Sequence, residues 1–163
     1  MSDESRRLID QLQREFDGDP WHGPSLTDLL ASVDATLASQ RPAGSTHSIW
    51  ELVLHITGWK REVAARLGGK LASDPAGGDW PDPGEPSGGR WRAAQEDLAK
   101  AHAELIAAVE ALPGALMHEP VRDERNPALG TGMTAWQTIS GVLQHDVYHA
   151  GQVAILKKVA GGR

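Results

Sequence analysis

Apolar residues recur at spacings of three and four positions in four stretches of the chain. This spacing aligns side chains on one face of a helix, because an α-helix has about 3.6 residues per turn. The pattern predicts long helices over residues 3–16, 45–67, 87–112 and 134–159, and one or two short helical turns within 26–40. Strict alternation of apolar and polar residues, which is typical of a half-buried strand, does not extend over a useful length anywhere. We therefore expect an all-α fold.

The segments between the long helices are rich in glycine and proline. Residues 68–90 hold seven glycines and four prolines in 23 positions, which predicts a long surface loop between distant helix ends. Residues 113–133 are interrupted in the same way, with a short extended piece expected at 119–122. Four long amphipathic helices with one long and one medium connection predict a single four-helix-bundle domain over residues 1–163, with the Gly/Pro-rich loop between the second and third helices.

Composition narrows the classes of function. The chain of 163 residues is 40% hydrophobic and 23% charged, as ordinary globular domains are. Its formal charge of −6 argues against binding to nucleic acid. The chain has no cysteine, so a metal would be held by histidine and carboxylate. No run approaches the ~20 apolar residues of a membrane span, and the start Met-Ser-Asp-Glu is unlike a signal peptide. We expect a cytoplasmic protein with no membrane partner.

Two of the seven histidines have the spacing of a metal-binding pair. His145 and His149 lie four positions apart in the last predicted helix, so their side chains share one face. Such a pair is a bidentate ligand for Zn²⁺, Ni²⁺ or Fe²⁺. The run 145–149 superficially resembles the zinc-protease helix, but nothing after His149 is acidic or histidine. The metalloprotease interpretation therefore fails, and a third ligand has to come from upstream.

His55 is the best upstream candidate for the third ligand. It lies in the run Leu-Val-Leu-His-Ile in the middle of the second predicted helix, where a solvated position is not expected. The alternative for His55 is a core histidine that is hydrogen-bonded to a neighbouring helix. His102, on the apolar face of the third helix, is the rival, either as a ligand or as part of a cavity lining. The remaining histidines are expected on the surface: His22, His47 and His118.

Three motifs resemble the DinB-like (DinB/YfiT) superfamily of metal-dependent enzymes. They are Trp-His-Gly-Pro-Ser at 21–25, His-Ser-Ile-Trp-Glu-Leu-Val-Leu-His-Ile at 47–56, and His-Asp-Val-Tyr-His-Ala-Gly-Gln at 145–152. The resemblance extends over about residues 5–158. It implies a four-helix bundle of unusual topology with a three-histidine metal site, whose ligands map onto His55, His145 and His149.

Three neutral imidazoles would leave a divalent ion, Zn²⁺ or Ni²⁺, with its full charge and an open position. This favours an anionic fourth ligand such as hydroxide, carboxylate or thiolate. Glu51, one turn from His55, is the candidate general base. Asp146 and Gln152 are candidates to hold a ring N–H or a metal-bound water. For the charged residues Glu51 and Asp146, the alternative is a position on the helix surface. Two tryptophans are candidates for the pocket wall, with core packing as the alternative: Trp59 and Trp91.

The resemblance implies an enzyme, since relatives in the superfamily include transferases that use a low-molecular-weight thiol such as bacillithiol or mycothiol. Metal-assisted hydrolysis and a non-catalytic stress-response protein that binds metal or a small ligand are the alternatives.

The last helix also has a second apolar side. Either residues 26–40 or a second copy of the chain in a homodimer would cover this side. It consists of Ile139, Leu143, Val147, Ala150 and Ala154.

Overall fold

The computed structural model of the chain describes residues 1–42, 44, 47–121 and 132–161. Over these residues the fold is all-α and has no strand beyond one isolated bridge. The helices are α1 (Asp3–Asp17), α2 (Leu26–Leu30), α3 (Ala35–Ser39), α4 (Ile49–Leu67), α5 (Gly88–Ala111), the 3₁₀ turn η1 (Gly114–Leu116) and α6 (Ala135–Ala160).

Each of the six α-helices begins after a polar residue whose side-chain oxygen accepts a hydrogen bond from a backbone N–H of the first turn. Such a cap satisfies one of the free N–H groups of the helix and contributes about 1 kcal/mol. In α2, α4 and α6 the side chain of the third helical residue also accepts a hydrogen bond from the backbone N–H of the cap residue, which completes a capping box. The caps are Ser2, Ser25, Asp34, Ser48, Ser87 and Thr134.

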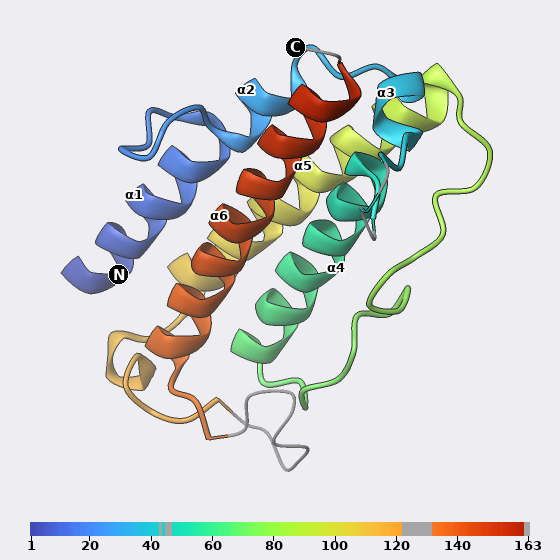
Figure 1. Cartoon of the computed structure of the whole chain (residues 1–163). Coiled ribbons are helices and arrows are strands. Elements are labelled where there is room, and N and C mark those ends of the chain that lie inside the picture. Colours follow the sequence, from blue (N-terminus) through green and yellow to red (C-terminus); the bar gives the residue numbers. More distant parts are fainter. Residues whose placement is uncertain (43, 45–46, 122–131, 162–163) are drawn as a thin grey trace.

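The four long helices lie side by side (Figure 1). Helix α4 packs against α5 and α6, and α1 packs against the same two helices. Figure 1 shows α4 and α5 running in the same direction, with the connecting segment returning along the length of α4. Two parallel neighbours cannot be joined by a short turn, so this arrangement requires a long connection. Residues 68–87, which contain no helix or strand, provide it.

The core has two parts along the length of the molecule. One contains Trp50 and Trp91, whose rings meet edge to face with centroids 5.2 Å apart. The indole N–H of Trp91 donates to the carbonyl of Val33 at 2.7 Å, so this tryptophan is a core residue that holds the α2–α3 region. The other part gathers around Leu12 and Leu105, from α1 and α5.

Of the extended piece expected at 119–122, between α5 and α6, the structure shows an isolated bridge at Pro120, and residue 122 lies outside the described residues. Pro120 pairs with Thr134 in an antiparallel bridge, and the N–H of Val121 donates to the carbonyl of Met133 at 2.9 Å. The rest of this connection, residues 122–131, lies outside the described residues.

The second apolar side of α6 is covered in part by the same chain. Ile139 and Ala150 are buried, whereas Leu143, Val147 and Ala154 are half-buried. Both α1 and α2 contact α6. Of the expected cover by residues 26–40, α2 provides a part. Helix α1 provides a further part of the cover, which the sequence pattern did not predict.

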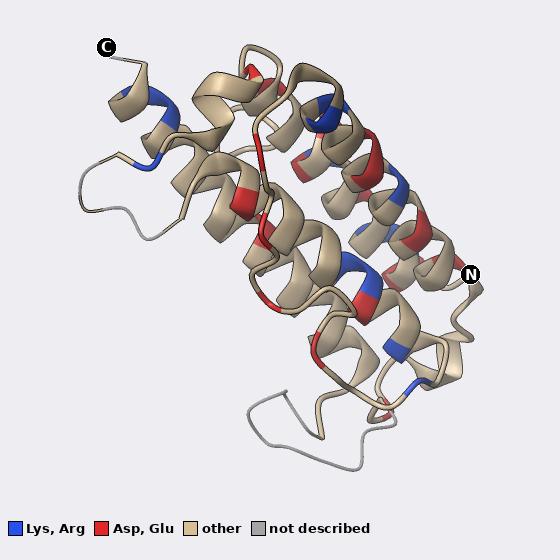
Figure 2. Cartoon of the chain, turned by 90° about the vertical axis from the view of Figure 1, so that its right-hand side faces the viewer, with Lys and Arg blue, Asp and Glu red and all other residues tan. Residues whose placement is uncertain are grey.

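Charged residues of both signs are interspersed along the helices on the face shown in Figure 2. The segment 68–87 crosses this face, and four of its five charged residues are acidic. Basic residues do not form a continuous track on this view of the described chain. None of the described helices has the length and apolar character that spanning a bilayer requires.

Candidate metal centre

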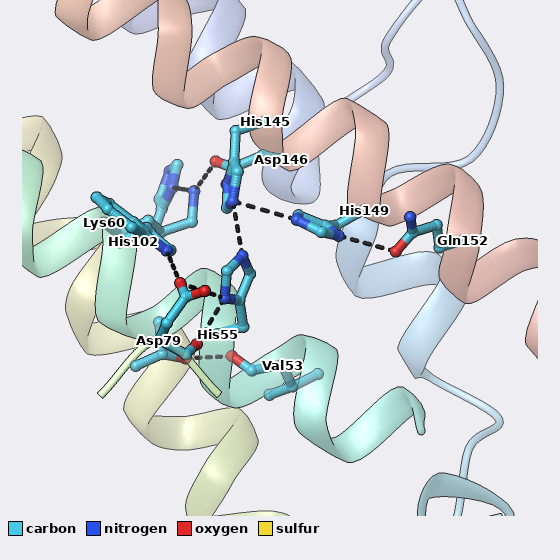
Figure 3. Close-up of polar contacts among 11 residues, drawn as sticks. Val53, His55, Lys60, Asp79, His102, His145, Asp146, His149 and Gln152 are labelled. Atoms are coloured by element: carbon cyan, nitrogen blue, oxygen red, sulfur yellow. Dashed lines mark hydrogen bonds and ion pairs between the residues drawn. The ribbon is translucent and has the colours of Figure 1, made fainter. Parts of the chain in front are cut away.

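Three histidines from two helices converge on one point. His55 comes from the middle of α4, and His145 and His149 come from successive turns of α6. Figure 3 shows their rings pointing toward one another. The Nε2 atom of His145 lies 2.9 Å from that of His55 and 3.1 Å from that of His149. His55 and His149 are buried, and His145 is partly exposed. We call this cluster the histidine triad.

The outer ring nitrogens of two triad histidines are held by acceptors. His55 donates from Nδ1 to the backbone carbonyl of Asp79 at 2.7 Å. His149 donates from Nδ1 to the side-chain oxygen of Gln152 at 2.9 Å. A proton on Nδ1 leaves the lone pair of Nε2 free, so both rings present an acceptor to the centre of the triad. Gln152 thus holds a ring N–H, which is one of the two roles for which the sequence makes it a candidate.

The third outer nitrogen faces a carboxylate without reaching it. His145 Nδ1 lies 3.6 Å from an oxygen of Asp146, which is longer than a hydrogen bond. Both of these atoms are buried and have no hydrogen-bond partner among the described residues. Asp146 points into the protein interior, toward Lys60 of α4, as Figure 3 also shows.

Asp79 and Trp80 of the segment 68–87 complete the surroundings of the triad. The Asp79 carboxylate accepts a hydrogen bond from the indole of Trp59 at 2.8 Å and lies 3.2 Å from His55 Nδ1. Trp80 stacks on His55 at 3.9 Å between centroids and on His47 at 3.5 Å on its other face. His47 is therefore half-buried and not a free surface residue. The sequence pattern missed Asp79 and Trp80, because a Gly/Pro-rich loop has no periodicity that assigns a direction to its side chains.

Burial keeps two triad imidazoles neutral. Burial lowers the pKa of His149 to about 4, the hydrogen bond to Gln152 opposes this, and the other two triad histidines add to the lowering. The pKa of His55 is also lowered by burial, against the opposing bond to Asp79. Neutral imidazole is the form that binds a metal ion, so near neutral pH these rings are already in the ligand state.

Glu51 lies apart from the triad. Arg41 donates to both of its oxygens, and the backbone N–H of Ser48 donates to one of them at 2.8 Å. Burial alone would raise the pKa of Glu51, but these hydrogen bonds outweigh burial and lower it. Glu51 is thus a helix-capping carboxylate in the structure. It could act as the expected general base only after its ion pair with Arg41 is broken.

His102 belongs to a second polar cluster, next to the triad but separate from it. Its Nδ1 lies 3.3 Å from the ammonium of Lys60, and its ring stacks on Phe16 at 4.0 Å. Lys60 pairs with Asp146, and both side chains are 0% exposed. Burial, with the charge of Lys60, lowers the pKa of His102 to about 3 against the opposing charge of Asp146. His102 is therefore a neutral core residue bound to Lys60.

The donor set of the triad fits a divalent ion. Tetrahedral Zn²⁺ binds imidazole nitrogen at about 2.0–2.1 Å, which places ligand nitrogens roughly 3.3 Å apart. The measured Nε2 separations of 2.9 and 3.1 Å are close to that value. The Nε2 lone pairs of His55 and His149 face the centre of the triad together with Nε2 of His145, where a divalent cation would bind them, and the triad is the group of described residues that could hold such an ion.

The comparisons with known proteins agree with this geometry. The sequence profile of the DinB superfamily matches residues 21–153, which include the whole triad. No curated protein and no solved structure matches the chain.

Proposed function

Because the chain belongs to the DinB superfamily, we propose that it is a metal-dependent enzyme acting on a small molecule, with one Zn²⁺ or Ni²⁺ ion held by His55, His145 and His149. The observation that carries the proposal is the convergence of three Nε2 atoms from two helices. A divalent ion bound there would supply Lewis acidity and lower the pKa of a bound thiol or water.

The residues around the triad are suited to hold the ligands in position. Asp79 and Gln152 fix the ring orientation and the tautomer of His55 and His149. Asp146 faces the outer nitrogen of His145 and is itself held by Lys60. Trp59 and Trp80 exclude water from two sides of His55. These side chains bind and orient; the structure assigns no proton transfer to them.

We place thiol transfer ahead of hydrolysis. A free base close to the bound water would assist hydrolysis, but the three carboxylates expected or found nearby are engaged: Glu51 with Arg41, Asp79 with Trp59, and Asp146 with Lys60. A thiol ionises near pH 8.5 and needs less help from a base. The chain has no cysteine of its own, so the nucleophile would be a small-molecule thiol. Hydrolysis and non-catalytic binding of a metal or ligand are the alternatives.

The proposal extends to the whole molecule. The family assignment and the packing of α1, α4, α5 and α6 support a DinB-type four-helix bundle, for which we propose a single domain over residues 1–163 and a cytoplasmic location. A homodimer would use the exposed stripe of α6, because the other apolar side is partly covered by α1 and α2. This stripe consists of Tyr148, Ile155 and Val159. Light scattering should give twice the chain mass, and Ile155→Lys should give the monomer mass; a monomeric wild type would remove the dimer.

Cobalt spectroscopy tests the function. The protein loaded with Co²⁺ is titrated with small thiols while the visible and near-ultraviolet spectra are recorded. Thiolate-to-cobalt charge transfer is expected for the wild type and for His102→Ala, and not for His149→Ala. His102→Ala is the matched control, because it removes an equally buried imidazole outside the triad.

Three other outcomes discriminate the alternatives. A spectrum that no thiol changes, together with ester or amide turnover, would replace transfer by hydrolysis. The same spectrum with no turnover on a broad panel would favour the binding protein. Full cobalt occupancy in His55→Ala would overturn the assignment of the third ligand.

A further inference from the structure

A cavity between α4 and the first half of α6 adjoins the triad. Its volume is about 270 Å³, and its lining includes Trp59 and Val63 of α4 and Val142 and His145 of α6. His145 thus belongs both to the triad and to the cavity wall. Three larger cavities of about 350, 510 and 650 Å³ have no triad histidine among their lining residues.

The accessible surface of this cavity is mainly apolar. The walls are the indole of Trp59 and aliphatic side chains of Val63, Met133 and Val142. The polar groups on the lining are committed to the protein itself. Arg66 donates to Glu62 at 3.1 Å and to the carbonyl of Ser73 at 3.2 Å. The polar residues from α6 bond to its cap: Gln137 accepts from the N–H of Thr134, and the Thr138 hydroxyl donates to the carbonyl of Thr134.

Trp59 is a fixed wall of this cavity. Its indole N–H donates to the Asp79 carboxylate at 2.8 Å, and the guanidinium of Arg66 lies over its ring at 5.6 Å. A half-buried aromatic wall that is held at both its edge and its face keeps the shape of the cavity without a ligand. Preorganisation of this kind favours binding, because little freedom is lost when the ligand enters.

Gly141 keeps one side of the cavity open. It lies inside α6, where glycine is less favourable than alanine, and it is one of the lining residues. A Cβ atom added at Gly141 would meet no heavy atom within 4 Å, so close packing does not require glycine there. At Gly58 of α4, in contrast, a Cβ would lie 3.0 Å from Pro75. The space beside Gly141 is open volume that a larger side chain would occupy.

We propose that this cavity binds the apolar part of the substrate, a single ring or a branched aliphatic group of similar size, and holds it beside His145. The size follows from volume: a cavity of about 150 Å³ accommodates benzene, so about 270 Å³ admits a substituted ring and is too small for a peptide-sized thiol. This inference rests on the proposed function, since it assigns the electrophilic substrate to the cavity and leaves the thiol to approach the triad from elsewhere.

The test uses 4-fluorotoluene as the probe, with binding followed by ¹⁹F NMR on the full chain. Wild-type protein should bind 4-fluorotoluene saturably. Gly141→Leu should weaken 4-fluorotoluene at least tenfold. Gly151→Leu is the matched control: it lies on the same helix, its added Cβ also meets nothing within 4 Å, and it is absent from the cavity lining. Its affinity should stay within twofold of wild type.

Intermolecular NOEs from the probe to the Trp59 indole and the His145 ring provide a second measurement that does not depend on a variant's folding. Absence of saturable binding, equal binding by Gly141→Leu, or NOEs to other residues only would overturn the inference. The cobalt–thiol spectrum reports separately on the proposed function. An intact thiol signal without probe binding removes the cavity assignment alone, whereas probe binding at Trp59 without a thiol signal removes the thiol chemistry alone.

Discussion

Glu15 of α1 is a buried carboxyl group without a hydrogen-bond partner among the described residues. It is 2% exposed, and neither of its oxygens is bonded. Burial raises its pKa to about 8, the charge of Asp146 adds to this, and Lys60 opposes it. An ordinary glutamate titrates near 4.5, so the folded state binds this proton more tightly than the unfolded chain does. The associated stability is fully present below about pH 4.5 and is lost as the pH rises through 8.

Glu15→Gln should therefore gain stability relative to wild type as the pH rises from 5 to 8. The amide keeps the shape of the side chain and removes the cost of a buried carboxyl that tends to ionise. We expect a relative gain of at least about 1 kcal/mol across that range, measured by urea unfolding. Glu110→Gln, at an exposed position of α5, should show no such drift. The same pH dependence in wild type and Glu15→Gln would contradict this account.

The segment 68–87 connects two parallel helices and also forms part of the site. Its residues Asp79 and Trp80 contact His55 from two directions, through a hydrogen bond to Nδ1 and through ring stacking. Trp80 lies between His47 and His55, with both rings nearly parallel to its own. The segment is thus held on α4 by the same side chains that orient a metal ligand.

Trp80→Ala should release this segment while the helices stay intact. A stacked aromatic pair contributes about 0.5–1.5 kcal/mol beyond its buried area, and two such pairs are lost here. We expect faster limited proteolysis within 68–87, weaker zinc binding in competition with a chromophoric chelator, and an unchanged far-ultraviolet circular dichroism spectrum. Trp21→Ala is the matched control, because Trp21 is fully exposed. Equal proteolysis and zinc affinity in both variants would show that Trp80 does not hold the segment.

Two polar connections join α4 to α6 across the interior of the molecule. Lys60 and Asp146 form an ion pair in which both side chains are completely buried. One helical turn away on α4, His55 meets His145 and His149. The ion pair needs no ligand, whereas the triad would join the helices more strongly with a cation among its nitrogens. The stability of the whole molecule should therefore depend on bound metal.

Zinc should raise the melting temperature, and chelation should lower it. A ligand that binds only the folded state stabilises it by about 4 kcal/mol at a free concentration of 1,000 times its Kd, which corresponds to about 8–16 °C for a domain of this size. Differential scanning calorimetry with zinc and with a chelator measures the difference. It should vanish in His149→Ala and persist in His102→Ala. A melting temperature of wild type that is indifferent to zinc and chelator would contradict the metal centre.

The residue pattern by itself determined the features that depend on local geometry. The helices follow from spacing and from caps such as Ser48 and Thr134, whose bonds reach only three residues along the chain. The pairing of His145 with His149 follows from one turn of a helix, and the family resemblance added His55. The family profile and the cluster of the three side chains agree with that assignment.

Only the tertiary structure decided which distant groups meet. Asp79 and Trp80 reach His55 through a segment without periodicity, so no local pattern could point to them. Glu51 was expected beside the metal because it lies one turn from His55, yet the long side chain of Arg41 reaches its carboxylate from the chain before α4. Lys60 and Asp146 are residue types that normally face water, and each is buried because the other neutralises its charge. Such pairings depend on how helices pack, which the spacing of residues along one helix does not encode.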